Sequence, residues 1–135
     1  MRALVLLFAS SLALASAQAG EMAKQGDASS TLYLVGLPMT GIIVGIMRSN
    51  NGDAMFDKMG IRVTESGDRR ETVLIDAEGD QIFETFEISG TFRYVRGTGK
   101  YAGISGEGTW ICESIRPEGP EPLRICQNKS NWKLP

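Results

Sequence analysis

Residues 96–110 read RGTGKYAGISGEGTW, and this stretch decides the fold class. It holds five glycines within a dozen residues: Gly97, Gly99, Gly103, Gly106 and Gly108. Glycines at such short intervals allow a strand to bend sharply, to bulge or to pass close under a neighbouring backbone. Tyr101, Ile104 and Trp110 stand among them and supply side chains for packing. The stretch therefore predicts tightly curved β-structure, such as the wall of a small barrel.

Two nucleotide-binding interpretations of the same glycines fail on the residues around them. The run from Gly97 to Ala102 fits a loose dinucleotide-binding pattern, but that pattern requires a helix directly after it, and three further glycines follow instead. Gly99-Lys100 is typical of a phosphate-binding loop only when Ser or Thr comes next to bind the metal, and Tyr101 stands there.

Short apolar runs separated by Gly- and Asp-rich turns occupy the rest of the chain from residue 31 onward. Turn signals include the run from Asn50 to Asp53 and Glu78-Gly79-Asp80, and the best helical candidate, Ala54–Met59, is about one and a half turns long. Roughly eight short strands at close spacing indicate an antiparallel sandwich or barrel. The expected strands are Thr31–Val35, Gly41–Met47, Ile61–Glu65, Thr72–Asp76, Gln81–Ile88, Thr91–Arg96, Gly108–Ile115 and a last one around Ile125–Trp132.

The run GTGKYAGISGEGTW resembles the glycine-rich signature of the allene oxide cyclase barrel and dirigent-like superfamily, in particular its small exported bacterial members without an assigned activity. DAEGDQIF, residues 76–83, resembles the hairpin that precedes this signature in those proteins. The likeness covers about residues 72–112 and departs at Arg96, where the family has glycine. It implies a single antiparallel β-barrel of about eight strands. The superfamily includes plant cyclases of fatty-acid epoxides and dirigent proteins that steer phenoxy-radical coupling, but a shared barrel carries neither activity with it.

The first residues predict export. Arg2 precedes an uncharged apolar run from Ala3 to Ala15, and small residues then allow cleavage after Ala17 or Ala19. The run is too short for a stable membrane span. The expected organisation is a signal peptide over 1–19, a flexible leader over 20–30 and a β-barrel domain over 31–135, in a periplasmic or secreted protein. Losing Arg2 from 14 basic residues leaves 13 against 16 acidic ones, a formal charge of −3, which does not favour nucleic-acid binding.

The two cysteines, Cys112 and Cys126, are predicted to form a disulfide, because an even count in an exported domain favours pairing. A catalytic thiol would need a basic partner to lower its pKa, and the chain contains no histidine. The same absence removes the usual general base, the Ser-His-Asp triad and the commonest metal ligand. No cofactor or metal site is expected.

Two glutamates are the weak candidates for acid–base chemistry. Glu84 alternates with Ile82 and Phe86, so it points to their side of a strand. If that side is the interior of the barrel, desolvation raises the pKa of Glu84 and makes it a proton donor or acceptor; on the outer side or at the rim it would pair with an arginine. Glu113 lies in the same pattern between Ile111 and Ile115, beside a cysteine that fixes a structural corner.

Aromatic side chains are the candidates for a ligand pocket, and packing is the competing interpretation for each of them. They are Tyr33, Phe86, Tyr94, Tyr101 and Trp110. The acidic turn of Asp76, Glu78 and Asp80 is too compressed for a twelve-residue calcium loop and is expected to be a solvated hairpin turn.

Three function classes remain from the sequence. The first is an exported barrel that binds a small apolar molecule or a protein partner without catalysis. The second is a cofactor-free cyclase or isomerase that acts on a lipid-like or phenolic substrate through Glu84. The third is an envelope interaction protein, such as an inhibitor of a secreted hydrolase.

Overall fold

A computed structural model of the chain describes residues 23–135 apart from 53 and 120. The predicted signal peptide, residues 1–19, lies outside the described residues. Within them, no helix has both the length and the apolar character needed to cross a membrane.

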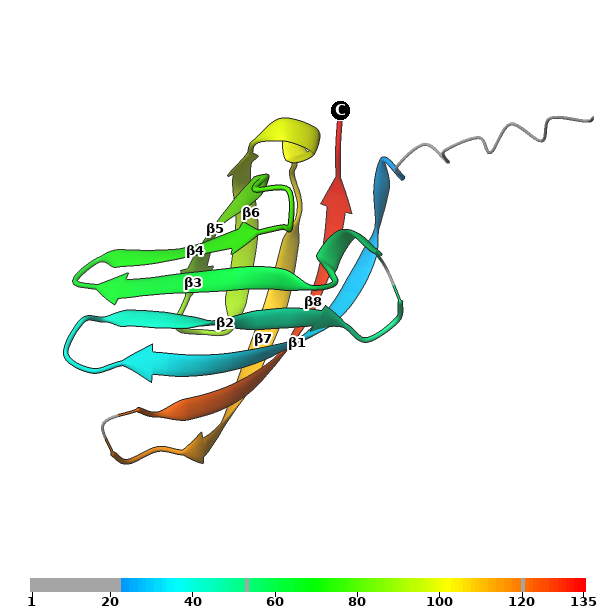
Figure 1. The fold of residues 1–135 in the computed structure, drawn as a ribbon. Helices are drawn as coiled ribbons and strands as arrows, with labels where there is room; N and C mark the ends of the chain where they lie inside the picture. The colour runs from blue at the N-terminus through cyan, green and yellow to red at the C-terminus, as the bar shows by residue number, and fades with distance from the viewer. Residues whose placement is uncertain (1–22, 53, 120) are drawn as a thin grey trace, which may run out of the picture.

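Eight antiparallel strands close into one barrel in which each strand pairs with its sequence neighbours and the last pairs with the first (Figure 1). The all-β barrel and the eight expected strand segments are confirmed. The strands are β1 (Gln25–Leu37), β2 (Ile42–Ser49), β3 (Met59–Ser66), β4 (Arg69–Ile75), β5 (Gln81–Glu87), β6 (Thr91–Gly97), β7 (Glu107–Arg116) and β8 (Leu123–Lys133).

Strand β1 begins six residues before the expected Thr31, inside the segment predicted to be a flexible leader. Its first half pairs with the end of β8, from Gln25 opposite Lys133 to Ser30 opposite Asn128. Ala28 and Ser30 are buried while Asp27 is exposed, so the small polar residues keep the alternation of a strand. The prediction of a flexible leader is wrong over these residues. They are small and polar, so their alternation of buried and exposed positions does not appear as a hydrophobic pattern in the sequence.

The glycine-rich stretch contains two strand ends and a short helix rather than one bent strand. β6 ends at Gly97, the 3-10 helix η2 (Gly99–Tyr101) follows, and β7 begins at Glu107. A Cβ at Gly97 would collide with the backbone oxygen of Tyr101, and one at Gly108 with the backbone oxygen of Lys129 and the ring of Phe92. Close backbone approach, one of the expected uses of these glycines, is therefore confirmed at both positions.

One half of the barrel interior is filled by large side chains. We call it the closed half; it lies at the end where η2 and the C-terminus are found (Figure 1). The expected helical segment after β2 is the 3-10 helix η1 (Ala54–Phe56), which places Phe56 in this half. The Phe56 ring stacks on Tyr94 at 5.7 Å and meets Trp132 edge-on at 6.2 Å. The largest fully buried side chains of the described residues are Phe56, Met59, Leu74 and Ile82.

Candidate functional site

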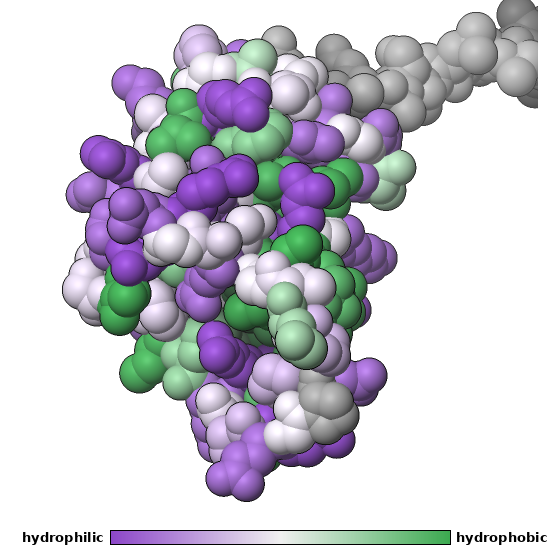
Figure 2. Space-filling view, turned by 90° about the vertical axis from the view of Figure 1, so that its left-hand side faces the viewer, coloured by the Kyte–Doolittle hydropathy of each residue, from purple (hydrophilic) through white to green (hydrophobic). Residues whose placement is uncertain are grey.

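The other half of the barrel interior, which we call the open half, contains a small cavity. It lies toward the end that bears the β1–β2, β3–β4, β5–β6 and β7–β8 connections, and its volume is about 70 Å³. Leu34, Ile43 and Val63 give it an apolar wall, and Glu65 and Arg124 bring charge to it. Figure 2 views the molecule from the side of the β1–β2 and β3–β4 loops, where hydrophobic residues lie among hydrophilic ones.

Glu84 lies inside the barrel, between the closed and the open half. On β5 it alternates with Ile82, which is fully buried, and with Phe86, which borders the cavity. Its Cα is paired with those of Thr72 on β4 and Tyr94 on β6. Only 4% of Glu84 is exposed, and desolvation raises the pKa of its carboxyl group to about 8. The carboxyl group is therefore mostly protonated and neutral at pH 7.

Three buried polar atoms around this cavity have no hydrogen-bond partner among the described residues. They are Glu84 Oε1, Trp110 Nε1 and Asn128 Oδ1, and all three residues line the cavity. A fourth such atom, Trp132 Nε1, belongs to the closed half, where its ring packs against Phe56. Buried polar groups without partners each cost about 1–3 kcal/mol, so a group of three around one cavity calls for an explanation.

Two of the five predicted pocket aromatics reach the cavity. Phe86 and Trp110 form adjacent parts of its wall, with ring centroids 6.2 Å apart in an edge-to-face contact. Tyr94 is instead part of the closed half: its ring contacts Phe56 and Phe92, and its hydroxyl shares a 2.8 Å hydrogen bond with Ser130 Oγ.

Tyr33 and Glu113 lie on the outer surface and do not contribute to the cavity. Tyr33 is 48% exposed, because Leu32 and Leu34 take the inward positions of β1. Glu113 is exposed on β7, where Trp110 and Cys112 take the inward positions. The interior placement considered for each is therefore wrong. Ile111 and Ile115, which share the side of Glu113, are exposed as well.

The predicted disulfide between Cys112 and Cys126 is confirmed, and it forms part of the cavity wall. The two cysteines are directly opposed on β7 and β8, so the bond links neighbouring strands near the 117–122 loop. Asn128 follows Cys126 by two residues on β8 and points to the same side. The sequence analysis missed Asn128 and Thr72, although strand alternation from Cys126 could have indicated the first.

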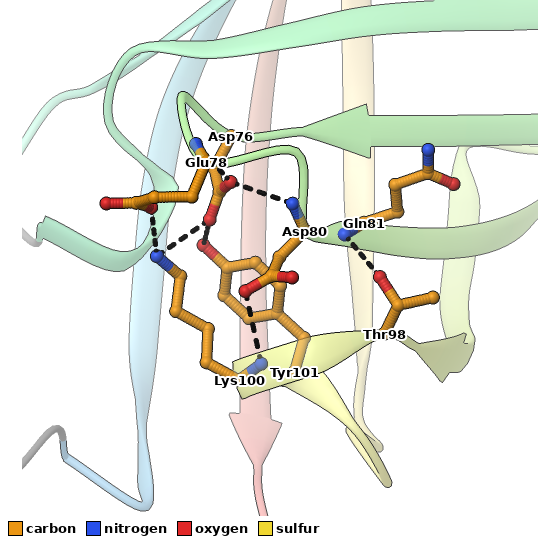
Figure 3. Close-up of polar contacts among 7 residues, drawn as sticks. All are labelled: Asp76, Glu78, Asp80, Gln81, Thr98, Lys100 and Tyr101. Carbon is orange, nitrogen blue, oxygen red and sulfur yellow. Dashed lines mark hydrogen bonds and ion pairs between the residues drawn. The ribbon is translucent and has the colours of Figure 1, made fainter.

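At the closed end, the acidic turn and the glycine-rich motif bind each other (Figure 3). Asp76 is the centre of this contact. Its Oδ2 accepts a hydrogen bond from the Tyr101 hydroxyl at 2.9 Å and forms an ion pair with Lys100 Nζ at 2.8 Å. Its Oδ1 accepts the backbone N–H groups of Glu78 and Asp80. Thr98 and Gln81 add two further bonds between the same segments.

This contact changes the pKa values of its members. Burial alone would raise the pKa of Asp76, but the hydrogen bonds from Lys100, Tyr101 and the two backbone groups outweigh burial and lower the pKa to about 2. Hydrogen bonds to Asp76 and Glu78 raise the pKa of Lys100. Burial and the bond to Asp76 raise the pKa of Tyr101. The solvated-turn prediction is therefore wrong for Asp76, whose side chain is only 10% exposed.

The Asp76 contact is structural rather than a ligand site. Tyr101, a predicted pocket residue, is 3% exposed here and its hydroxyl is occupied by Asp76. Across the described part of the chain, no cluster of His, Cys, Asp or Glu has the arrangement of a metal site. Lys100 is neutralised by two carboxylates and so does not offer an anion site.

A larger hollow of about 900 Å³ lies on the outside of the barrel, over β5 to β8 and the start of β1. Its charged side chains have mixed sign: Asp27, Glu87, Glu107, Arg93 and Lys129. Its only aromatic residue, Phe92, is 5% exposed because the ring points into the barrel. Size alone favours this hollow, but the buried polar atoms without partners gather around the interior cavity, which is the better candidate site.

Comparison with protein-family models, curated proteins and solved structures found no match to this chain.

Proposed function

We propose that the open half of the barrel binds a small, mostly apolar molecule that carries one hydroxyl group. The observation that supports this is the set of three buried polar atoms without protein partners around one apolar cavity: Glu84 Oε1, Trp110 Nε1 and Asn128 Oδ1. This function is the first of the three classes from the sequence, a barrel that binds a small apolar molecule without catalysis.

The chemistry of these three atoms selects the ligand group. Trp110 Nε1 can only donate a hydrogen bond, and Asn128 Oδ1 can only accept one. Glu84, with a pKa raised to about 8, is neutral at pH 7, so its carboxyl group can do either. A hydroxyl group both donates and accepts, so it can satisfy Trp110 and Asn128 together. A carbonyl group could satisfy only the donors, and an apolar group would satisfy none.

The size of the cavity limits what can be fully enclosed. About 70 Å³ has room for little more than two water molecules, each of which takes about 30 Å³ in the liquid. The hydroxyl end of a ligand fits this space, and the apolar remainder would contact Leu34, Ile43 and Val63 toward the mouth. We therefore expect millimolar affinity for a minimal ligand and tighter binding for a longer apolar one.

Benzyl alcohol and toluene test the proposal because they differ by one hydroxyl group and absorb little where tryptophan is excited. Trp110 lies at the cavity and Trp132 in the closed half, and these are the only two tryptophans. In a Trp132→Phe variant the fluorescence of Trp110 should change saturably with benzyl alcohol. The affinity for toluene should be about tenfold lower or worse, because toluene leaves the three polar atoms without partners.

Two variants control this experiment. Trp110→Phe leaves only Trp132 as a reporter, and its fluorescence should not respond to benzyl alcohol. Asn128→Leu should lower the affinity for benzyl alcohol while leaving that for toluene unchanged or improved. Equal affinities for the two compounds, or no saturable response in Trp132→Phe, would overturn the proposal.

A second candidate function is catalysis by Glu84, as the resemblance to barrel cyclases suggests. The observation in its favour is a carboxylic acid that is neutral at pH 7 inside a cavity, where it could protonate a bound epoxide or phenolic substrate. Glu84→Gln should abolish turnover of an unsaturated fatty-acid epoxide and retain binding of benzyl alcohol. Unchanged turnover in that variant would exclude Glu84 as the acid.

We also propose export to the periplasm or the medium, as the first residues of the chain suggest. The disulfide between Cys112 and Cys126 is compatible with an oxidising compartment. Mass spectrometry of the protein recovered from the cell envelope should give a chain that begins after Ala17 or Ala19. A full-length chain in the cytoplasmic fraction would contradict export.

A further inference from the structure

The barrel wall has a free strand edge along the second half of β7. Strand β6 pairs with β7 only as far as Thr109. One more backbone bond follows, from the N–H of Trp110 to the carbonyl oxygen of Gly90 at 2.8 Å. From there to Arg116, β8 is the only strand paired with β7 in the described part of the chain. The β7–β8 hairpin therefore extends beyond the β5–β6 turn (Figure 1).

The backbone groups of Cys112 and Ser114 point to this free edge. Residues two apart on a strand direct their N–H and C=O groups to the same side, and Trp110 directs its N–H toward β6. The Cα atoms of Cys112 and Cys126 are 4.0 Å apart, the short spacing of an antiparallel pair that exchanges no hydrogen bonds. On the β6 side, neither Cys112 nor Ser114 has a backbone bond to a residue that the structure describes, and both are exposed.

The outward side chains beside this edge form a short pattern of their own. Ile111 is 72% and Ile115 58% exposed, and the exposed Glu113 lies between them. Glu113 forms no ion pair with any described residue. A bulge between Ser114 and Arg116 then ends the regular strand. The edge therefore offers unpaired backbone groups together with two apolar side chains and one carboxylate, which are the features that recruit another strand.

A second copy of this chain fits the edge poorly. If two β7 edges paired symmetrically, with Ile111 of one copy opposite Ile115 of the other, each Glu113 would lie directly opposite Glu113 of the other copy. Like charges in directly opposed positions destabilise a strand pair. A basic side chain opposite Glu113 would stabilise the pair instead.

We propose that the free edge of β7 binds an extended segment of another protein as an added antiparallel strand. The segment would place a basic side chain opposite Glu113 and apolar side chains opposite Ile111 and Ile115. Backbone bonds to Cys112 and Ser114 give such a complex its affinity, and the three side chains give it selectivity. The added strand lies on the wall of the barrel, so its binding does not depend on a ligand in the cavity.

The probe for this site is the peptide Thr-Val-Thr-Arg-Thr-Val-Thr, blocked at both ends. In the protein alone, NMR should show rapid hydrogen exchange at the amides of Cys112 and Ser114 and slow exchange at those of Ile111 and Glu113, which face β8. Saturating peptide should slow exchange at Cys112 and Ser114 about tenfold or more. Unchanged exchange at these two amides would overturn the proposal.

Methylation of peptide nitrogens tests whether the backbone carries the binding. The two threonines next to the arginine would lie opposite Cys112 and Ser114, so methylating their nitrogens should abolish the protection. Methylating the nitrogen of the arginine is the matched control, because that N–H faces away from β7, and protection should remain. Equal effects of the two modifications would overturn strand addition.

A charge exchange tests the opposed pair. The same peptide with glutamate in place of arginine should bind the protein about fivefold more weakly, and Glu113→Arg should reverse this preference. Glu107→Arg is the matched variant, because Glu107 is also exposed on β7 but lies where β7 still pairs with β6. It should keep the preference for the arginine peptide. An unchanged preference in Glu113→Arg would overturn the predicted register.

The protein alone provides the last test. If the amides of Cys112 and Ser114 became protected as the protein concentration rises, with a dimer in sedimentation equilibrium, the edge would belong to a second copy. That result would overturn the proposed partner.

Discussion

The two halves of the barrel interior are built by the same strands but filled in opposite ways. The closed half holds Phe56, Leu74 and Ile82, each at most 1% exposed. The ring of Phe56 stacks on that of Tyr94 there. The open half holds a cavity, a disulfide and a neutral glutamic acid. On β5 the change occurs within two residues, from Ile82 to Glu84.

This difference separates the packing that stabilises the fold from the cavity that we propose as a binding site along the axis of one barrel. The closed half buries the large apolar side chains that stabilise the fold, and the Asp76 contact holds its end together. The open half keeps polar atoms without partners, which lowers stability and is typical of sites kept for function. Substitutions that remove a large side chain should therefore cost more stability in the closed half than in the open half.

The largest expected effect is the loss of a ring from the closed half. Phe56→Ala should lower the free energy of unfolding by about 3–5 kcal/mol, because the surrounding rings cannot collapse into the space. Phe86→Ala in the open half should cost only about 2 kcal/mol, because its ring already borders a cavity. Urea unfolding followed by circular dichroism measures both. Equal losses would show that the two halves do not differ in packing.

The sequence predicts the strands better than it predicts which of their side chains point into the barrel. Period-two alternation and turn residues predicted all eight strands, and the position of Glu84 beside Ile82 and Phe86 placed it on their side of β5 but left open whether that side is the interior. The alternation cannot tell inside from outside where both sides of a strand are apolar. Tyr33 lies between Leu32 and Leu34, and Val44 follows Ile43, so only closure of the barrel decides which of them point inward.

Contacts between distant segments were beyond prediction for a different reason. The bond between Asp76 and Tyr101 joins residues 25 positions apart, and it depends on where the β4–β5 turn and η2 meet in space. The resemblance to barrel cyclases includes both motifs but does not state that they touch. Their mutual binding gives the first part of the glycine-rich stretch, up to Tyr101, a structural role at the closed end, whereas Trp110 at the end of the stretch lines the cavity.

The next effect tests the buried carboxyl group of the open half through pH. The pKa of Glu84 is raised from about 4.5 to about 8, so the folded protein holds a proton that the unfolded chain releases. The stabilisation is complete below pH 4.5 and is lost as pH rises toward 8. Between pH 5 and pH 8 the free energy of unfolding should fall by on the order of 3 kcal/mol from this group.

Glu84→Gln is the matched variant, because its amide resembles the neutral acid and does not titrate. Its urea midpoint should be nearly constant from pH 5 to pH 8 and should exceed that of the wild type at pH 8. A wild-type midpoint that is flat over this range, or a variant that keeps the slope, would show that Glu84 is not the buried titrating group of the open half.

The smallest effect belongs to the closed end and has the opposite sign with pH. The pKa of Asp76 is lowered from 3.8 to about 2, so its stabilisation is present above pH 4 and is lost as pH falls toward 2. Asp76→Asn should cost about 2 kcal/mol at pH 6 and remove that acid-dependent loss. Glu78→Gln is the control, because Glu78 also pairs with Lys100 but is 71% exposed; it should cost less than about 0.5 kcal/mol.

Measured together, the two carboxylates make the comparison between the halves quantitative. Raising the pH from 5 to 8 should weaken the wild type only through the open half, and lowering it from 4 to 2 should weaken it partly through the Asp76 contact. A double variant, Glu84→Gln with Asp76→Asn, should lose both dependences additively, because the two residues share no hydrogen-bond partner. Non-additivity above about 0.5 kcal/mol would mean that Glu84 and Asp76 are energetically coupled across the barrel.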